Sequence, residues 1–113
     1  AVALFGDWRQ SGPVWALPYR ALRGVRNANL AAAGRCLSAA TSVWDVTRAI
    51  PVCAASGEAA GVAAALALRE ARGDLAALPP ARLAAELAAR GVPLSPALVR
   101  PAPEDPGTVR KPE

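Results

Sequence analysis

The hydrophobic pattern of the chain changes near residue 47, from short apolar runs to long stretches with helical spacing. Residues 14–19 are apolar and partly aromatic, which predicts a short strand that Pro18 ends or keeps at a sheet edge. Residues 29–33 form another short apolar run before Gly34; its length suits a buried strand, whereas its alanines do not. Residues 1–12 contain turn-forming residues and are predicted to be irregular.

A long helix is predicted to follow these short runs. It begins at Asp45 or Thr47, either of which can cap it, and continues to about Arg72, where Gly73 stops it. The helix is apolar nearly all round, so most of its surface is expected to be covered.

One face of this helix carries very small residues. Gly57 and Gly61 are four positions apart and share that face with alanines beside them. Such a stripe indicates that another segment approaches the helix closely, and packing on a sheet is the simplest explanation.

A second, amphipathic helix begins at residues 79–80, which are both proline, and ends before Gly91. Leu83 and Leu87 lie on its apolar face. Residues 95–113 contain five prolines and mixed charges, and we interpret them as an extended tail without a core of its own.

The composition limits how much core the chain can form. Its 113 residues fit one small domain, and much of the 53% hydrophobic content is alanine, which buries little area. Only three Trp, one Phe and one Tyr provide large aromatic anchors, so part of the core is expected to come from another polypeptide. The chain also lacks an initiator Met, so we expect a processed product or a fragment. No uninterrupted apolar segment is long enough for a membrane span, so no membrane partner is expected.

The missing residue types exclude several kinds of site. Without histidine, the chain lacks the commonest general base and the usual member of a catalytic triad, and with only two cysteines it offers no zinc site; its catalytic residues stay unknown. The net charge of +4 is almost entirely arginine, but the arginines alternate with acids along the helices instead of forming one basic stripe. A nucleic-acid partner is therefore not expected.

The segment from residue 29 to residue 65 carries the most chemical information. It is predicted to form a short strand, a Gly-Arg turn and then the small-residue helix, with Arg35 at the turn and Arg48 at the start of the helix. A helix N-terminus with unpaired N–H groups and a nearby arginine suits an anionic or electron-rich ligand. The alternatives are that both arginines pair with carboxylates, and that Trp44 is either a core or interface anchor or part of the substrate space.

The same segment resembles the C-terminal part of the FAD-dependent oxidoreductase family related to the glutathione reductase and fumarate reductase flavoproteins. Members typically carry I-P-Y-R, then N-L-L-V-A-G-R-C-I-S-A-T-H-E, then R-V-M-P-T-C-M-A-M-G-Q-A-A-G-T-A-A-A. This chain has L-P-Y-R at residues 17–20, N-L-A-A-A-G-R-C-L-S-A at residues 29–39, and R-A-I-P-V-C followed by G-E-A-A-G within residues 48–61. The last two align without a gap, and the resemblance covers about residues 14–94.

The resemblance implies an α/β fold in which residues 1–94 complete an FAD-binding, Rossmann-like domain. It implies that Ala33, Gly34 and Arg35 lie against the ribityl and phosphate portion of FAD. It also implies that the residues at the helix N-terminus face the pyrimidine edge of the flavin ring. Those residues are Arg48, Ala49 and Ile50.

Two departures from the family pattern limit this interpretation. No G-x-G-x-x-G follows a strand anywhere in the chain, so the phosphate-binding half of the site must come from an N-terminal chain or segment that carries such a loop. The T-H-E of the family is replaced by Ala40, Thr41 and Ser42, and neither hydroxyl is a general base unaided.

The sequence therefore favours a fragment or subunit of an FAD-dependent oxidoreductase that acts on a small-molecule substrate within a hetero-oligomer in the cytoplasm. The alternative is a small, non-catalytic helical accessory subunit whose Ala/Gly face packs on a partner.

Overall fold

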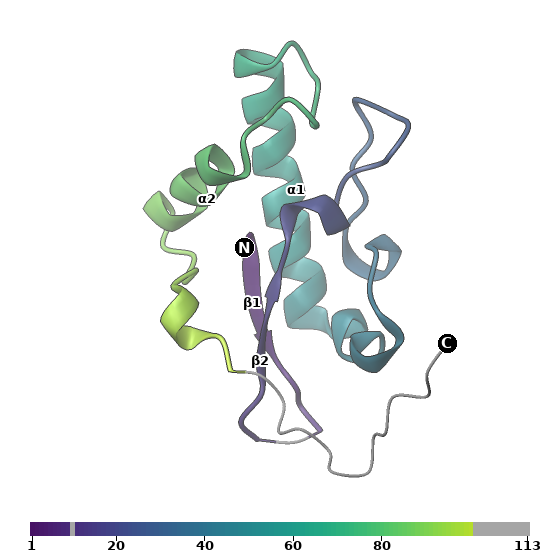
Figure 1. Cartoon of the computed structure of the whole chain (residues 1–113), viewed down its shortest axis with the longest axis vertical. Coiled ribbons are helices and arrows are strands. Elements are labelled where there is room, and N and C mark those ends of the chain that lie inside the picture. The colour runs from purple at the N-terminus through teal and green to yellow at the C-terminus, as the bar shows by residue number, and fades with distance from the viewer. Residues whose placement is uncertain (10, 101–113) are drawn as a thin grey trace, which may run out of the picture.

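A two-stranded antiparallel sheet and two helices make up the regular structure of the computed structural model, which describes residues 1–9 and 11–100 (Figure 1). Short 3-10 turns lie between and beyond these elements. This mixture of helix and short sheet is compatible with the α/β class that the sequence predicts. The elements are, in chain order, β1 (Ala3–Gly6), β2 (Val14–Leu17), α1 (Ile50–Glu70) and α2 (Pro80–Ala89).

The N-terminal hairpin corrects one prediction and confirms another. Residues 1–12 were expected to be irregular, but they contain β1, which pairs with β2 so that Ala3 lies opposite Leu17. Val2 and Ala3 are almost fully buried. The burial of these two apolar side chains stabilises the strand, although turn-forming residues follow it in the sequence. The strand predicted within residues 14–19 is confirmed as β2, which ends just before Pro18.

The apolar run at residues 29–33 is not a strand, so the strand interpretation of it was wrong. The run folds back on the preceding loop through one isolated bridge, between Arg23 and Ala31. The N–H of Ala32 also donates to the carbonyl of Leu22 at 2.6 Å. Alanine side chains bury too little area to hold a longer strand pairing together.

The first long helix begins later than the sequence predicts. Residues 46–48 form a separate 3-10 turn, and Ala49 is extended before α1 begins at Ile50. The reason is Pro51, whose ring would clash with the carbonyl of residue 47 if the helix started at Asp45 or Thr47. The C-terminal end is close to the prediction, because Gly73 has φ +82° and donates its N–H to the carbonyl of Ala67 at 2.8 Å.

The core lies where α1, α2 and the hairpin meet. Ala59, Ala63 and Leu66 form the inner face of α1, and each is fully buried. Leu83 and Leu87 of α2 pack into the same cluster, which confirms the predicted apolar face of the second helix. Small residues on α1 allow the large side chains of its neighbours to reach the helix surface.

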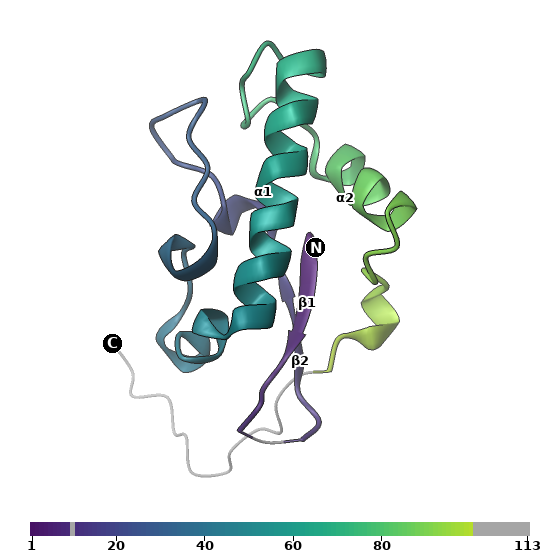
Figure 2. The same ribbon diagram turned by 180° about the vertical axis from the view of Figure 1, so that it is seen from behind.

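The outer face of α1 has no covering element among residues 1–9 and 11–100. Figure 2 shows the helix in front of the sheet with no other element before it. Ile50 and Leu68, near its two ends, are 83% and 73% exposed, and an added Cβ at Gly57 or Gly61 would meet nothing within 4 Å. By length and composition this helix could cross a membrane, although a single helix of this kind is weak evidence for a membrane span.

Part of the predicted tail returns to the sheet. Pro96–Leu98 forms a 3-10 turn, and Arg100 then pairs with Val14 through backbone hydrogen bonds of 2.8 and 2.9 Å. The remainder of the predicted tail, residues 101–113, lies outside the described residues.

Tyr19 ties the hairpin to the loop after α1 and provides a test of this packing. Its side chain is 6% exposed, and its hydroxyl donates to the carbonyl of Leu75 at 2.8 Å. Burial raises the pKa of the phenol above the ordinary value of 10.0.

We expect the titration of Tyr19 to be shifted to high pH in the folded protein. Because the folded pKa is raised, its contribution to stability is complete below pH 10 and is lost as pH rises through the folded pKa. Tyr19 is the only tyrosine, so tyrosinate absorbance reports it directly. Tyr19→Phe should remove this alkaline transition and lower the free energy of unfolding by about 1–2 kcal/mol, since the Leu75 carbonyl loses its partner. An ordinary pKa in the folded protein would contradict the buried hydrogen bond.

Candidate functional site

The Gly-Arg turn is anchored on the first turns of α1. The N–H of Gly34 donates to the Ser56 hydroxyl at 2.9 Å, and that hydroxyl donates to the carbonyl of Cys53 at 3.0 Å. Ser56 is fully buried, and both of its hydrogen bonds are made within the protein. The hydroxyl therefore fixes the 3-10 turn Gly34–Cys36 against the start of the helix.

Gly34 adopts a backbone conformation that favours glycine. Its φ is +61°, and the preceding Ala33 is extended. A Cβ added at Gly34 would lie 3.7 Å from Cβ and Sγ of Cys53, which is an ordinary contact. The left-handed backbone, and not lack of space, is therefore the reason for glycine at this position.

The N-terminus of α1 has unused hydrogen-bond donors. Ala49 precedes it and no side chain caps it, while Pro51 has no N–H to satisfy. Among the hydrogen bonds of the described residues, none is made by the N–H of Ile50 or Val52. These N–H groups and the helix dipole create a partly positive end.

Two arginines flank this end of the helix. The guanidinium of Arg48 stacks over the Trp44 ring at 4.4 Å from its centroid, and the side chain is half-buried. Arg35, on the Gly-Arg turn, is exposed. Within the part of the chain that the structure describes, neither arginine forms an ion pair, so the carboxylate alternative finds no partner there.

The structure thus brings the six predicted cofactor-binding residues to the turn and to the start of α1. Ala33, Gly34 and Arg35 form the turn, and Arg48 and Ala49 lie where α1 begins. Ile50, the sixth, is the first residue of the helix at the same place, and its side chain is 83% exposed.

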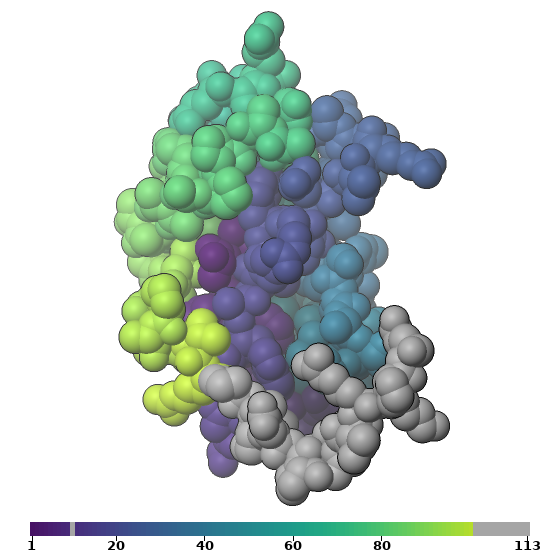
Figure 3. Space-filling view, in the orientation of Figure 1, coloured from purple at the N-terminus to yellow at the C-terminus, as the bar shows by residue number. Residues whose placement is uncertain are grey.

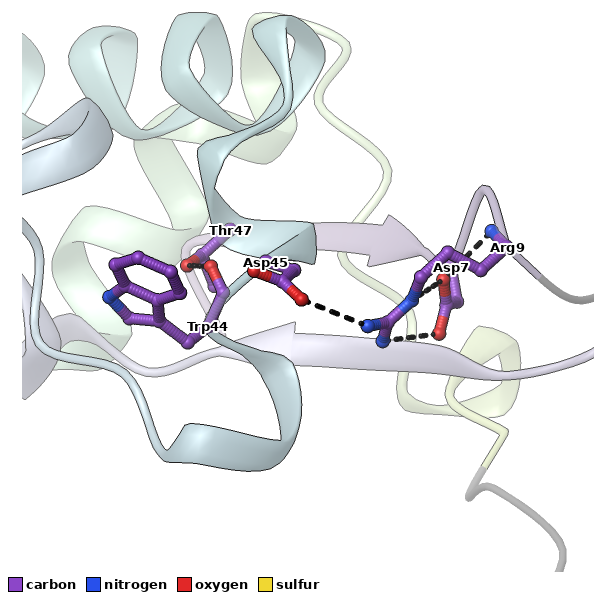
Figure 4. A network of polar contacts seen from close by, with 5 residues as sticks. All are labelled: Asp7, Arg9, Trp44, Asp45 and Thr47. Carbon is purple, nitrogen blue, oxygen red and sulfur yellow. Dashed lines mark hydrogen bonds and ion pairs between the residues drawn. The ribbon is translucent and has the colours of Figure 1, made fainter.

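A network of charges that the sequence analysis did not identify holds the segment before α1 in place (Figure 4). The guanidinium of Arg9 lies between Asp7, at 2.8 Å, and Asp45, at 3.5 Å. The Asp7 side chain is fully buried, whereas that of Asp45 is 63% exposed, so the bond to Asp7 is the stronger one. Beyond Asp45, the hydroxyl of Thr47 donates to the carbonyl of Trp44 at 2.7 Å and closes the turn.

A cavity of about 480 Å³ borders the helix N-terminus. Residues 4–8 line one side of it, and Ala49, Pro51 and Val52 line the other. A second hollow, of about 760 Å³, lies at the opposite end of α1, beside Leu68, and contains none of the predicted site residues.

Ser56 and the Arg9 network are the site features that sequence reasoning missed. A single serine among the alanines, glycines and valines of α1 was the available signal for the first. No comparable signal marked the second, because Arg9 and Asp45 are far apart in the sequence. Groups of three or more His, Cys, Asp or Glu that could hold a metal ion do not occur among the described residues.

The comparisons with known proteins yield one finding. Residues 5–87 match the family model described as FAD dependent oxidoreductase, and this range includes the turn, the segment before α1 and the whole of the helix. No curated protein and no solved structure matches the chain.

We expect Gly34→Ala to destabilise the protein by about 1–2 kcal/mol, because the left-handed backbone conformation is unfavourable for alanine. The added methyl group itself fits beside Cys53. Denaturant unfolding measures this change. Gly24→Ala is the matched control, since its Cβ would make only ordinary contacts, at 3.5 Å or more from Asn27, and no left-handed backbone is involved. Equal stability of the two variants would show that the turn does not hold its conformation.

Proposed function

The chain belongs to the FAD-dependent oxidoreductase family, and we propose that it closes the flavin site of such an enzyme. We further propose that it is the C-terminal part of a flavoprotein of the glutathione reductase and fumarate reductase type. One observation carries the proposal: the buried Ser56 hydroxyl holds the Gly-Arg turn against the uncapped start of α1. Two segments that the family resemblance assigns to the flavin are thereby brought into contact.

The residues at this site fit the electron-rich part of FAD, which is the cofactor that the family uses. The two free N–H groups at Ile50 and Val52 and the Arg48 guanidinium are the donors that the pyrimidine edge of a flavin requires. In the proposed arrangement, Arg48, Ala49 and Ile50 face this edge. Ala33, Gly34 and Arg35 lie along the ribityl and phosphate portion, where the glycine permits close approach of the backbone.

The bound FAD would supply hydride transfer, and the residues of this chain would supply electrostatic support. A reduced flavin carries negative charge near the pyrimidine edge, and the helix dipole and Arg48 are already positioned to stabilise it. The stacking of Arg48 on Trp44 fixes the guanidinium in advance. Thr41 and Ser42 are exposed, and the chain offers no histidine, so the acid–base group of the reaction belongs to a partner in this proposal.

The partner we propose is an N-terminal, cytoplasmic chain or segment that carries the Gly-rich phosphate loop. One feature of the described residues supports an incomplete assembly. The outer face of α1 is largely apolar, with Glu58 as an exposed charge, and it is uncovered, with Gly57 and Gly61 open to approach. A helix that is apolar on both faces normally has a partner on each.

The same exposed face favours a second candidate, an accessory subunit that only binds a partner. The two candidates differ in their relation to the flavin. An accessory subunit would assemble with its partner regardless of FAD, and changes at Arg48 would leave the flavin unaffected.

The decisive test of the proposed function is the reduction potential of the assembled flavoprotein. We expect Arg48→Ala to lower the two-electron potential of the flavin by about 20 mV, equivalent to roughly 1 kcal/mol, because a positive charge beside the reduced ring is removed. The potential is measured by redox titration against dyes of known potential.

Arg26→Ala is the control for the loss of one arginine, because Arg26 is exposed and lies in a loop outside the site. A potential that is the same in wild type, Arg48→Ala and Arg26→Ala would contradict the proposed role and favour the accessory subunit.

A second test concerns the outer face of α1. We expect Gly57→Ala and Gly61→Ala each to raise the free energy of unfolding of the chain by about 0.5–1 kcal/mol, because alanine favours the helix and nothing obstructs its methyl group. In the assembled protein the same methyl groups should weaken partner binding by about tenfold or more, because they separate closely packed surfaces.

Denaturant unfolding and the dissociation constant of the complex measure the two effects, with Gly24→Ala as a loop control. Stabilised variants that assemble as tightly as the wild type would show that no partner approaches this face.

A further inference from the structure

A cavity of about 380 Å³ lies between the hairpin and the segment that connects the Gly-Arg turn to α1. Its lining combines β2, the 3-10 turn Tyr19–Ala21 and parts of residues 38–47. Figure 3 shows the face on which the hairpin and this turn are exposed. Two of the lining residues are close in the sequence to the proposed flavin site: Ser38 lies three residues after Arg35, and Thr47 directly precedes Arg48.

The polar part of the wall is positive. Arg20 lines the cavity and forms no ion pair among the described residues. The N–H of Ser38 donates to the carbonyl of Ala21 at 3.0 Å, which places the serine beside the turn that carries Arg20. The Ser38 hydroxyl has no hydrogen bond within residues 1–9 and 11–100, and no acidic residue lines this cavity. Arg20 and Ser38 therefore line the cavity, and no acidic lining residue is present to neutralise the arginine.

The rest of the wall is apolar and partly aromatic. Phe5 and Trp15 are opposite each other across the two strands, with ring centroids 5.9 Å apart and planes inclined at 36°. Both are half-buried, so a ligand in the cavity would cover ring surface that is now exposed to solvent. Leu17 and Val43 complete this apolar side.

We infer that this cavity is the substrate pocket and that it takes a monocarboxylate with a flat apolar body. Arg20 is the one cation in the lining, so it provides for a single carboxylate, which a guanidinium binds through two parallel hydrogen bonds. The Ser38 hydroxyl donates to the same carboxylate, and the apolar body lies against Phe5 and Trp15. The position of the pocket beside the flavin rests on the proposed function, whereas its ligand chemistry rests on the cavity alone.

The test uses the assembled flavoprotein and phenylacetate as the probe, with phenylacetamide as its neutral counterpart and succinate as a dicarboxylate. Binding is measured by calorimetry, and the visible absorbance of the flavin is recorded in the same titration. We expect phenylacetate to bind most tightly and to perturb the flavin spectrum. Arg20→Ala should raise its dissociation constant by about tenfold or more, because a charge-assisted hydrogen bond is lost.

Two further variants separate charge from position. Arg20→Lys keeps the charge but not the paired hydrogen bonds, so its dissociation constant should lie between those of wild type and Arg20→Ala. Arg26→Ala removes an arginine outside the cavity and should bind as the wild type does. In Arg20→Ala the preference for phenylacetate over phenylacetamide should disappear.

Each outcome of the titration bears on one of the two proposals. Absence of phenylacetate binding, or binding that Arg20→Ala and Arg20→Lys leave unchanged, overturns the pocket. Succinate that binds more tightly than phenylacetate overturns the monocarboxylate specificity. Binding that depends on Arg20 but leaves the flavin spectrum unchanged supports the ligand chemistry of the cavity and overturns its assignment as the substrate pocket, whereas the flavin site itself is tested by the reduction potential of Arg48→Ala.

Discussion

The hydrogen bond from Gly34 to Ser56 is the constraint on which the site depends. It joins two segments that are 22 residues apart in the chain, and it is made inside the protein, where an unpaired donor or acceptor is costly. The hydroxyl also donates to the Cys53 carbonyl, so the turn, the serine and the helix form one unit. Because Gly34 is in the left-handed region, its N–H can point at the helix while the chain changes direction. The position of Arg35 follows from this arrangement.

A second, electrostatic contact lies at the approach to α1. Arg9 joins the end of β1 to Asp45, and Thr47 closes the turn that follows. Trp44 projects from the same turn on the side away from Arg9 (Figure 4), and Arg48 stacks on it. The hairpin therefore does more than contribute to the core: it holds the residues that precede the helix, and Phe5 and Trp15 of its two strands line the cavity beside them.

The sequence was sufficient for features that depend on local chemistry and insufficient for those that depend on distant contacts. The ends of α2 follow from the prolines at 79–80 and from Gly91, and β2 follows from its aromatic run and Pro18. The strand β1 was missed because its burial requires Leu17 and the core behind it, which are not visible in residues 1–12. At residues 29–33 the error was the opposite one: a strand was predicted where the structure has none. The alanines of this apolar run bury too little area to stabilise strand pairing. For the site, the position of Gly34 was predictable from the motif, but its partner Ser56 was hidden within a helix interpreted only through its small residues.

The hairpin leaves one strand edge free. β2 pairs with β1 on one side and with Arg100 on the other, whereas β1 has β2 as its single partner among the described residues. The unpaired N–H and C=O groups along such an edge can form hydrogen bonds with another extended chain, including the same edge of a second copy. The exposed apolar surface on the outer side of α1 is a second region that favours association. Self-association of the isolated chain through these two regions is therefore the expected consequence of this architecture.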